Sequence, residues 1–148
     1  MELPQDLIEL LVEFDAADVQ YLLIGGYAVS MLAEPRFTKD IDLWLGEDSE
    51  NLLRADRALK TFGAPKETIE ALKAAQGLDV TWMGKPPVRI DLMKNIPGVE
   101  FPGAYSRRKT IHIKNVRLNV IDKADLITTK LATGRPQDLL DIESLKKS

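Results

Sequence analysis

Two aspartates one residue apart carry the strongest chemical signal in the sequence. Asp40 and Asp42 lie in the run KDIDLWL at residues 39–45, whose alternating polar and apolar residues predict a strand. Alternate residues of a strand share one face, so these two carboxylates point the same way with Cα atoms roughly 7 Å apart. Together they could hold one or two hard cations such as Mg²⁺. A pair of this kind standing alone is more often a solvated surface feature, so a cation site is indicated only if other sequence features support it.

Two further features elsewhere in the sequence could take part in the same chemistry as the aspartate pair. Gly25 and Gly26 follow an apolar run and precede a predicted helix. Glycine lets a ligand approach the backbone, and a helix start attracts phosphate, although a plain tight turn has the same sequence. Asp91 supplies a third carboxylate within the predicted strand VRIDLM at residues 88–93. Taken alone, Asp91 also fits an exposed strand position.

A lysine and an aspartate near the C-terminal end interrupt apolar helical stripes. At 100° per residue, Lys130 falls inside the stripe of a helix ending near Thr133, and Asp138 falls inside that of the last helix. A charge on the core side is costly unless it is paired or faces a ligand. The two residues therefore indicate a structural ion pair, a phosphate-facing site, or both. We hypothesise that Asp138 orients Lys130 toward a triphosphate.

Hydrophobic periodicity predicts strands mixed with helices, which indicates an α/β or α+β class with a mixed sheet. A helix start is expected at Asp6, with Glu9 three residues later. The strands are expected at residues 19–24, 41–45, 80–83, 88–93, 110–113 and 116–121, with a turn at 84–87. The remaining helices are expected at residues 27–32, 49–62, 66–75, from Asp122 to Thr133, and 136–146.

Length and composition narrow the function classes. The 148 residues fit a single domain over 1–148, with the C-terminal helices at 122–147 packing on the sheet. There is no cysteine and one histidine, His112, which excludes a disulfide framework, a thiol nucleophile and a histidine-rich metal centre. No apolar run is long enough for a membrane span and the N-terminus lacks a basic signal region, so a cytoplasmic protein with no membrane partner is expected.

The net charge of −3 is unevenly distributed along the chain. Residues 1–103 carry 10 Lys and Arg against 18 Asp and Glu, whereas residues 104–148 carry 10 against 5. The C-terminal third is therefore either a cationic surface for phosphates or a lopsided but solvated one.

Taken together, the spaced motifs resemble the nucleotidyltransferase superfamily, which has a DNA polymerase β-like fold. The resemblance lies in IGG at residues 24–26, DIDL after 13 intervening residues, and IDL at 90–92. Arg36-Phe37-Thr38 is similar to the R-x-T of small bacterial members with a Gly-Gly turn. The run KLATGRPQDLLD at 130–141 is similar to the closing motif of AbiEii-type toxins. The resemblance covers residues 21–142.

The resemblance implies a mixed sheet of about five strands flanked by helices. It implies that Asp40, Asp42 and Asp91 hold two Mg²⁺ ions, with Mn²⁺ as an alternative, and that Asp91 accepts a proton. Lys130 would act catalytically with them, supported by Asp138. The nucleoside triphosphate would be bound by Gly25, Gly26, Arg36, Thr38 and Lys130.

The activity implied is transfer of a nucleoside monophosphate from a nucleoside triphosphate to an acceptor hydroxyl on tRNA or protein. The setting would be toxin–antitoxin or defence, with a cognate toxin or antitoxin as partner. One alternative is a small antibiotic-modifying nucleotidyltransferase, and another is a non-catalytic module that keeps the fold for binding. Many members have Gly-Ser where this chain has Gly25-Gly26, so a hydroxyl that could contact phosphate is missing.

Overall fold

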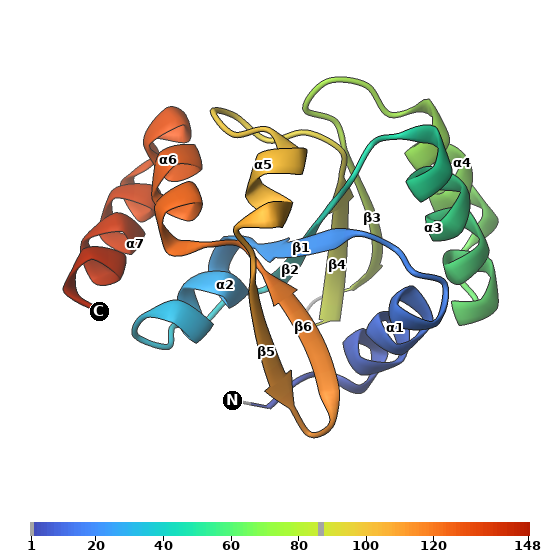
Figure 1. The fold of residues 1–148 in the computed structure, drawn as a ribbon, viewed down its shortest axis with the longest axis horizontal. Coiled ribbons are helices and arrows are strands. Elements are labelled where there is room, and N and C mark those ends of the chain that lie inside the picture. The colour runs from blue at the N-terminus through green and yellow to red at the C-terminus, as the bar shows by residue number, and fades with distance from the viewer. Residues whose placement is uncertain (1, 86–87) are drawn as a thin grey trace.

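A six-stranded mixed sheet forms the centre of the computed structural model, which describes residues 2–85 and 88–148 (Figure 1). The strands lie in the order β3-β4-β2-β1-β6-β5. Their bounds are β1 (Tyr21–Ile24), β2 (Asp40–Leu45), β3 (Val80–Lys85), β4 (Val88–Met93), β5 (Lys109–Ile113) and β6 (Val116–Val120). β2 runs parallel to β4 and β1 parallel to β6, while the other neighbours are antiparallel.

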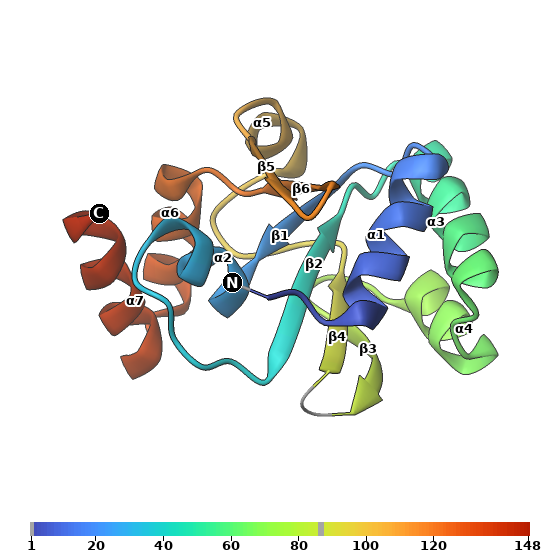
Figure 2. The same ribbon diagram turned by 90° about the horizontal axis from the view of Figure 1, so that it is seen from below.

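The helices of the described residues gather at the ends and on the faces of this sheet. They are α1 (Gln5–Ala16), α2 (Gly25–Leu32), α3 (Ser49–Phe62), α4 (Lys66–Ala74), α5 (Phe101–Ser106), α6 (Lys123–Thr133) and α7 (Pro136–Lys147). Figures 1 and 2 show α3 and α4 at one end of the molecule and the paired helices α6 and α7 at the other. α7 also packs against α2, which joins the C-terminal end of the chain to the glycine turn.

Local sequence signals account for several helix ends. Asp48 precedes α3 and accepts a hydrogen bond from the backbone N–H of Asn51, and Asp122 caps α6 in the same manner. Each side chain satisfies a backbone donor that the first helical turn leaves unpaired. Gly63 and Gly134 end these two helices at positive φ, 94° and 60°, a conformation that costs glycine little.

The hydrophobic core is continuous and includes a buried polar residue, Asn51, whose hydrogen bonds join two strands. Asn51 is fully buried; its amide donates to the carbonyls of Gln20 and Gly46, and its Oδ1 accepts from the Gln20 N–H at 2.7 Å. These bonds tie the start of β1 to the end of β2. Trp44 is buried beside them, with its ring edge-on to Phe101 and its Nε1 donating to a backbone carbonyl. Trp44 therefore belongs to the core.

The predicted class, a mixed sheet flanked by helices, is confirmed, with six strands in place of about five. The helix expected to start at Asp6 is present as α1, which begins one residue earlier, at Gln5 after Pro4, and has no side-chain cap. α2 begins at Gly25, two residues earlier than expected, and α5 was not predicted. Gly84 and Lys85 continue β3, while the rest of the expected turn, residues 86–87, lies outside the described residues. Within residues 2–85 and 88–148, no helix is long and apolar enough to span a bilayer.

Candidate active site

The three predicted acidic residues share one face of the sheet. Asp40 and Asp42 project from the same side of β2, and the parallel strand β4 places Asp91 directly beside Asp42. Arg89 lies beside Asp40 in the same register. Because paired residues on neighbouring strands have side chains on one face, two short motifs 50 residues apart form a single acidic group.

This acidic group is electrostatically strained without a cation. Burial, together with the negative charges of Asp91 and Asp40, raises the pKa of Asp42 to about 7. Arg89 partly compensates: its Nε donates to Asp91 Oδ1 at 2.8 Å and lies 3.9 Å from Asp40 Oδ1. Among the described residues, no group of three or more acids or histidines is preassembled around a metal position. The oxygen donor set fits Mg²⁺, provided that Arg89 releases Asp91.

Gly25 brings the backbone against the acidic group. β1 ends at Ile24, which pairs with Asp42, and Gly25 turns the chain into α2 at a φ of +68°. A Cβ atom at Gly25 would lie only 2.0 Å from Asp42 Oδ2, so no larger residue fits without displacing that carboxylate. No side chain caps the start of α2, which leaves its first N–H groups available to an anion beside the acids.

Gly26 explains why this chain has Gly-Gly rather than Gly-Ser. A Cβ atom built at Gly26 would lie 2.8 Å from the hydroxyl of Thr38 and 3.0 Å from Nη2 of Arg36. The Thr38 hydroxyl also donates to the backbone carbonyl of Asp40 at 3.1 Å. The R-x-T segment thus packs tightly on the glycine turn and fills the space that a serine side chain would need.

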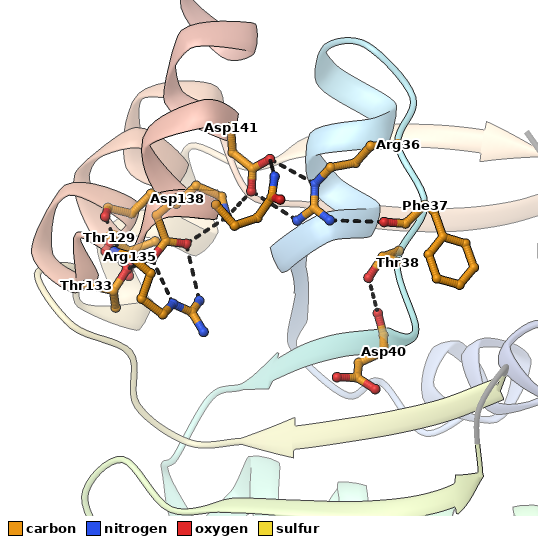
Figure 3. A network of polar contacts seen from close by, with 11 residues as sticks. Arg36, Phe37, Thr38, Asp40, Thr129, Thr133, Arg135, Asp138 and Asp141 are labelled. Atoms are coloured by element: carbon orange, nitrogen blue, oxygen red, sulfur yellow. Dashed lines mark hydrogen bonds and ion pairs between the residues drawn. The ribbon is translucent and has the colours of Figure 1, made fainter.

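Arg36 connects the loop before β2 to the last helix (Figure 3). Its Nε and Nη2 donate to the two carboxylate oxygens of Asp141 at 2.8 and 3.0 Å, and its Nη1 donates to the Phe37 carbonyl. Bidentate pairs of this kind fix geometry as well as charge. The structure therefore places Arg36 next to the glycine turn but already engaged with a buried carboxylate.

Lys130 is buried, as its helical periodicity predicts, and contacts two acids of α7. Its Nζ lies 2.9 Å from Asp141 Oδ2 and 3.5 Å from Asp138 Oδ1. Asp138 is held mainly by Arg135, whose Nε donates at 2.8 Å, and by the Thr133 hydroxyl at 2.7 Å. Asp141 is thus the nearer partner of Lys130, and the predicted pairing with Asp138 is the longer of its two contacts.

Asp138 and Asp141 both remain ionised despite their burial. Burial alone would raise the pKa of Asp138, but hydrogen bonds from Arg135 and Thr133 hold that pKa well below its usual range. Burial of Asp141 is likewise outweighed by hydrogen bonds, first from Lys130 and then from Arg36, and its pKa is lowered. Both carboxylates are therefore charged near neutral pH. We call the group formed by these residues the α7 charge network; its members are Arg36, Lys130, Thr133, Arg135, Asp138 and Asp141.

One cleft of about 610 Å³ joins the acidic group to the α7 charge network. Gly25, Asp42 and Asp91 line it from the sheet, and Lys130 and Arg135 line it from the helices. This volume lies within the range of pockets that hold ligands of nucleotide size. A polyanion with a bound divalent cation complements such a cleft, because it meets carboxylates on one side and cations on the other.

Sequence reasoning assigned no role to three charged residues of this region: Arg89, Arg135 and Asp141. A signal existed for Asp141, since residues 138, 141, 142 and 145 follow the i, i+3, i+4, i+7 spacing of one helix face. Arg89 shares its strand face with Asp91 two residues later, and the same alternation rule would have placed it there.

The glycine turn, the paired strand acids and the cleft that they share with Lys130 and Arg135 together define the nucleotidyltransferase class. The sequence matches the family of nucleotidyltransferases of unknown function (DUF6036) over residues 1–146, and the chain belongs to that family. No curated protein matches the chain in sequence.

Solved structures of low sequence identity share the fold. A Thermotoga maritima protein assigned as a nucleotidyltransferase, TM1012, has a TM-score of 0.64 at 14% identity, over 95% of this chain and 88% of that one. The lincosamide antibiotic adenylyltransferase LnuA, with lincomycin bound, has a TM-score of 0.56 at 17% identity, over 97% and 96%. ANT(2")-Ia, in complex with adenylyl-2"-tobramycin, has a TM-score of 0.57 at 15% identity, over 95% and 83%.

Proposed function

We propose that the protein transfers a nucleoside monophosphate from a nucleoside triphosphate to an acceptor hydroxyl in a Mg²⁺-dependent reaction. The observation that carries the proposal is the register of β2 and β4, which sets Asp42 beside Asp91 at the glycine turn. Three acidic side chains and a helix start then face one cleft together with Lys130 and Arg135. Each of these groups has a task in phosphoryl transfer, where positioning and electrostatics supply most of the catalysis.

Asp40, Asp42 and Asp91 would hold the metal ions. Bound there, Mg²⁺ would offset the charge that develops on the α-phosphate and on the leaving pyrophosphate. The first N–H groups of α2 would bind the phosphate tail, and Lys130 and Arg135 would add positive charge across the cleft. Asp91 lies nearer the sheet edge than Asp42, and its carboxylate would accept the proton of the attacking hydroxyl.

Label transfer tests this reaction directly. The purified protein is incubated with Mg²⁺ and each α-phosphate-labelled nucleoside triphosphate in host lysate, beside the Asp40→Asn/Asp42→Asn variant. Asp6→Asn serves as a matched control, because Asp6 is an exposed carboxylate on α1. We expect label in an acceptor with wild type and with Asp6→Asn, and none with the double variant or with EDTA. Equal labelling by the double variant would refute the proposed catalytic role.

The biological setting follows from the acceptor. The likeness of residues 130–141 to AbiEii-type toxins supports a tRNA or protein acceptor in a toxin–antitoxin or defence system, with a cognate partner. The antibiotic adenylyltransferases among the structural neighbours support a small-molecule acceptor. Expression in a host separates the two: growth arrest supports the first setting, and drug resistance without toxicity supports the second. Triphosphate binding without any transfer would instead support a binding module.

A further inference from the structure

The cleft has two halves of different chemistry. The half beside the glycine turn contains the cations Lys130 and Arg135. The half beyond Asp91 is lined by uncharged side chains, nearly all apolar. Its apolar members at the sheet edge, which we call the apolar shelf, are Leu78, Val80 and Met93, whereas Ile96 and Pro97 line the cleft from the loop that runs beside α6.

The register of the sheet places Asp91 at the boundary between these halves. Across the sheet, Ile24, Asp42, Asp91 and Trp82 occupy one row, which runs from the glycine turn to the edge strand β3. Met93 and Val80 pair in the next row on the same face. Of the two acids in this row, Asp42 and Asp91, it is Asp91 that lies beside the apolar side chains of the edge strand β3.

Leu78 and Val80 are the exposed members of the shelf, while Met93 is buried. Leu78 is 61% exposed, Val80 39% and the adjoining Trp82 57%. Leu78 and Val80 also line the cleft, so part of each side chain faces the site. Contiguous exposed apolar groups beside a polar site are typical of a ligand-binding surface.

The charges around the shelf do not favour a polyanion. Arg89 is the cation beside Trp82, with its guanidinium carbon 5.1 Å from the ring centroid, but it is engaged by Asp91 and lies near Asp40. Elsewhere, Arg107 pairs with Asp125, so the basic C-terminal third is partly neutralised by internal ion pairs. An RNA acceptor would bring phosphates next to Asp91, and the cation described beside it, Arg89, is already engaged by that carboxylate.

We infer that the apolar shelf binds the acceptor and that the acceptor is a small, uncharged or cationic molecule with a hydroxyl group and an apolar face. This inference rests on the proposed nucleotidyl transfer. The acceptor hydroxyl oxygen forms a bond to the α-phosphorus, the bond from that phosphorus to the oxygen bridging the β-phosphorus breaks, and pyrophosphate leaves. The hydroxyl proton passes to the carboxylate of Asp91 at the border of the shelf.

Leu78→Asp tests the shelf, because Leu78 lies in a turn outside β3 and its replacement disturbs no strand. Leu53→Asp on α3 is the matched control: Leu53 is 64% exposed and lies outside the cleft lining. Thermal melting first establishes that both variants fold. Transfer of α-phosphate label is then measured into two fractions of host lysate, the filtrate that passes a membrane retaining macromolecules and the retained RNA and protein.

We expect the filtrate to yield a labelled product that chromatography separates from the nucleotide and its hydrolysis products. Leu78→Asp should require about tenfold more filtrate for half-maximal transfer, and Leu53→Asp should behave as wild type. Binding of a fluorescent nucleoside triphosphate should be the same in all three proteins. Label confined to RNA or protein would overturn the inference while preserving nucleotidyl transfer. Weaker triphosphate binding by Leu78→Asp would also overturn it, because the shelf would then hold the nucleotide. Absence of a labelled product from both fractions would refute the proposed nucleotidyl transfer, and the inferred acceptor class would fail with it.

Discussion

Replacing Lys130 by methionine removes the ammonium group that lies between two buried carboxylates. The side chains of Lys130, Asp138 and Asp141 are 7%, 2% and 2% exposed, so water cannot take over the lost contacts. Leaving a buried charge without a partner costs about 3–5 kcal/mol. Here Asp138 keeps Arg135 and Asp141 keeps Arg36, so we expect a loss of about 2–3 kcal/mol in the free energy of unfolding, below that range.

Urea denaturation at neutral pH measures this loss, and thermal melting should show a decrease of about 4–12 °C for a chain of this length. Arg117→Met is the matched control, because Arg117 pairs with Asp15 in an ion pair about half exposed to water and should lose about 1 kcal/mol or less. The double variant Lys130→Met/Asp141→Asn also takes the carboxylate partner from Arg36, so it should be less stable than Lys130→Met. A Lys130→Met protein as stable as wild type would refute the reasoning.

The same variant separates a structural from a ligand-binding role for Lys130. If Lys130 also faces the triphosphate, Lys130→Met binds a fluorescent nucleoside triphosphate more weakly than wild type under conditions where both proteins are folded. Unchanged affinity would restrict Lys130 to the α7 charge network.

Three further predictions concern the acidic group and the glycine turn. Because folding raises the pKa of Asp42 from 3.8 to about 7, the metal-free protein should lose stability as pH rises through that window. Asp42→Asn should remove this slope in urea titrations with EDTA, and an unchanged slope would assign it to other groups. Arg89→Met frees Asp91 of its resident cation and should raise Mn²⁺ affinity, measured by electron paramagnetic resonance; weaker binding would contradict this competition. Gly26→Ser meets the Thr38 hydroxyl and should lower stability by about 1–3 kcal/mol in thermal melts, with Thr38→Ala restoring part of it.

Local patterns predicted most elements but not their arrangement. The predicted strand at residues 88–93 matches β4, and the helix at 49–62 matches α3, because alternation and helical stripes are strong there. α5 was missed because its sequence, FPGAYS, contains proline and glycine and spans only six residues. The parallel pairing of β2 with β4 depends on contacts between distant segments, and no local pattern encodes it.

The sequence predicts the three acidic residues of the site, but it does not predict the contacts between the charged residues around them. Asp40, Asp42 and Asp91 stand out by residue type within short motifs. The contact between Arg36 and Asp141 joins residues 105 positions apart, and no local pattern pairs them. Such pairs follow from the packing of α7 against α2, which only the folded chain brings about.

The α7 charge network also has a consequence for the acidic group. Arg36 is held by Asp141 of α7, and two residues later Thr38 bonds to the carbonyl of Asp40 at the start of β2. The path from the last helix to the first metal-binding candidate is therefore a short series of side-chain contacts (Figure 3). Because the cations of this path are already paired with carboxylates, its first task is to position the loop that leads into β2. Arg135 is also paired, with Asp138, but its side chain is 73% exposed and lines the cleft, so it is the cation of the α7 charge network most accessible to a phosphate.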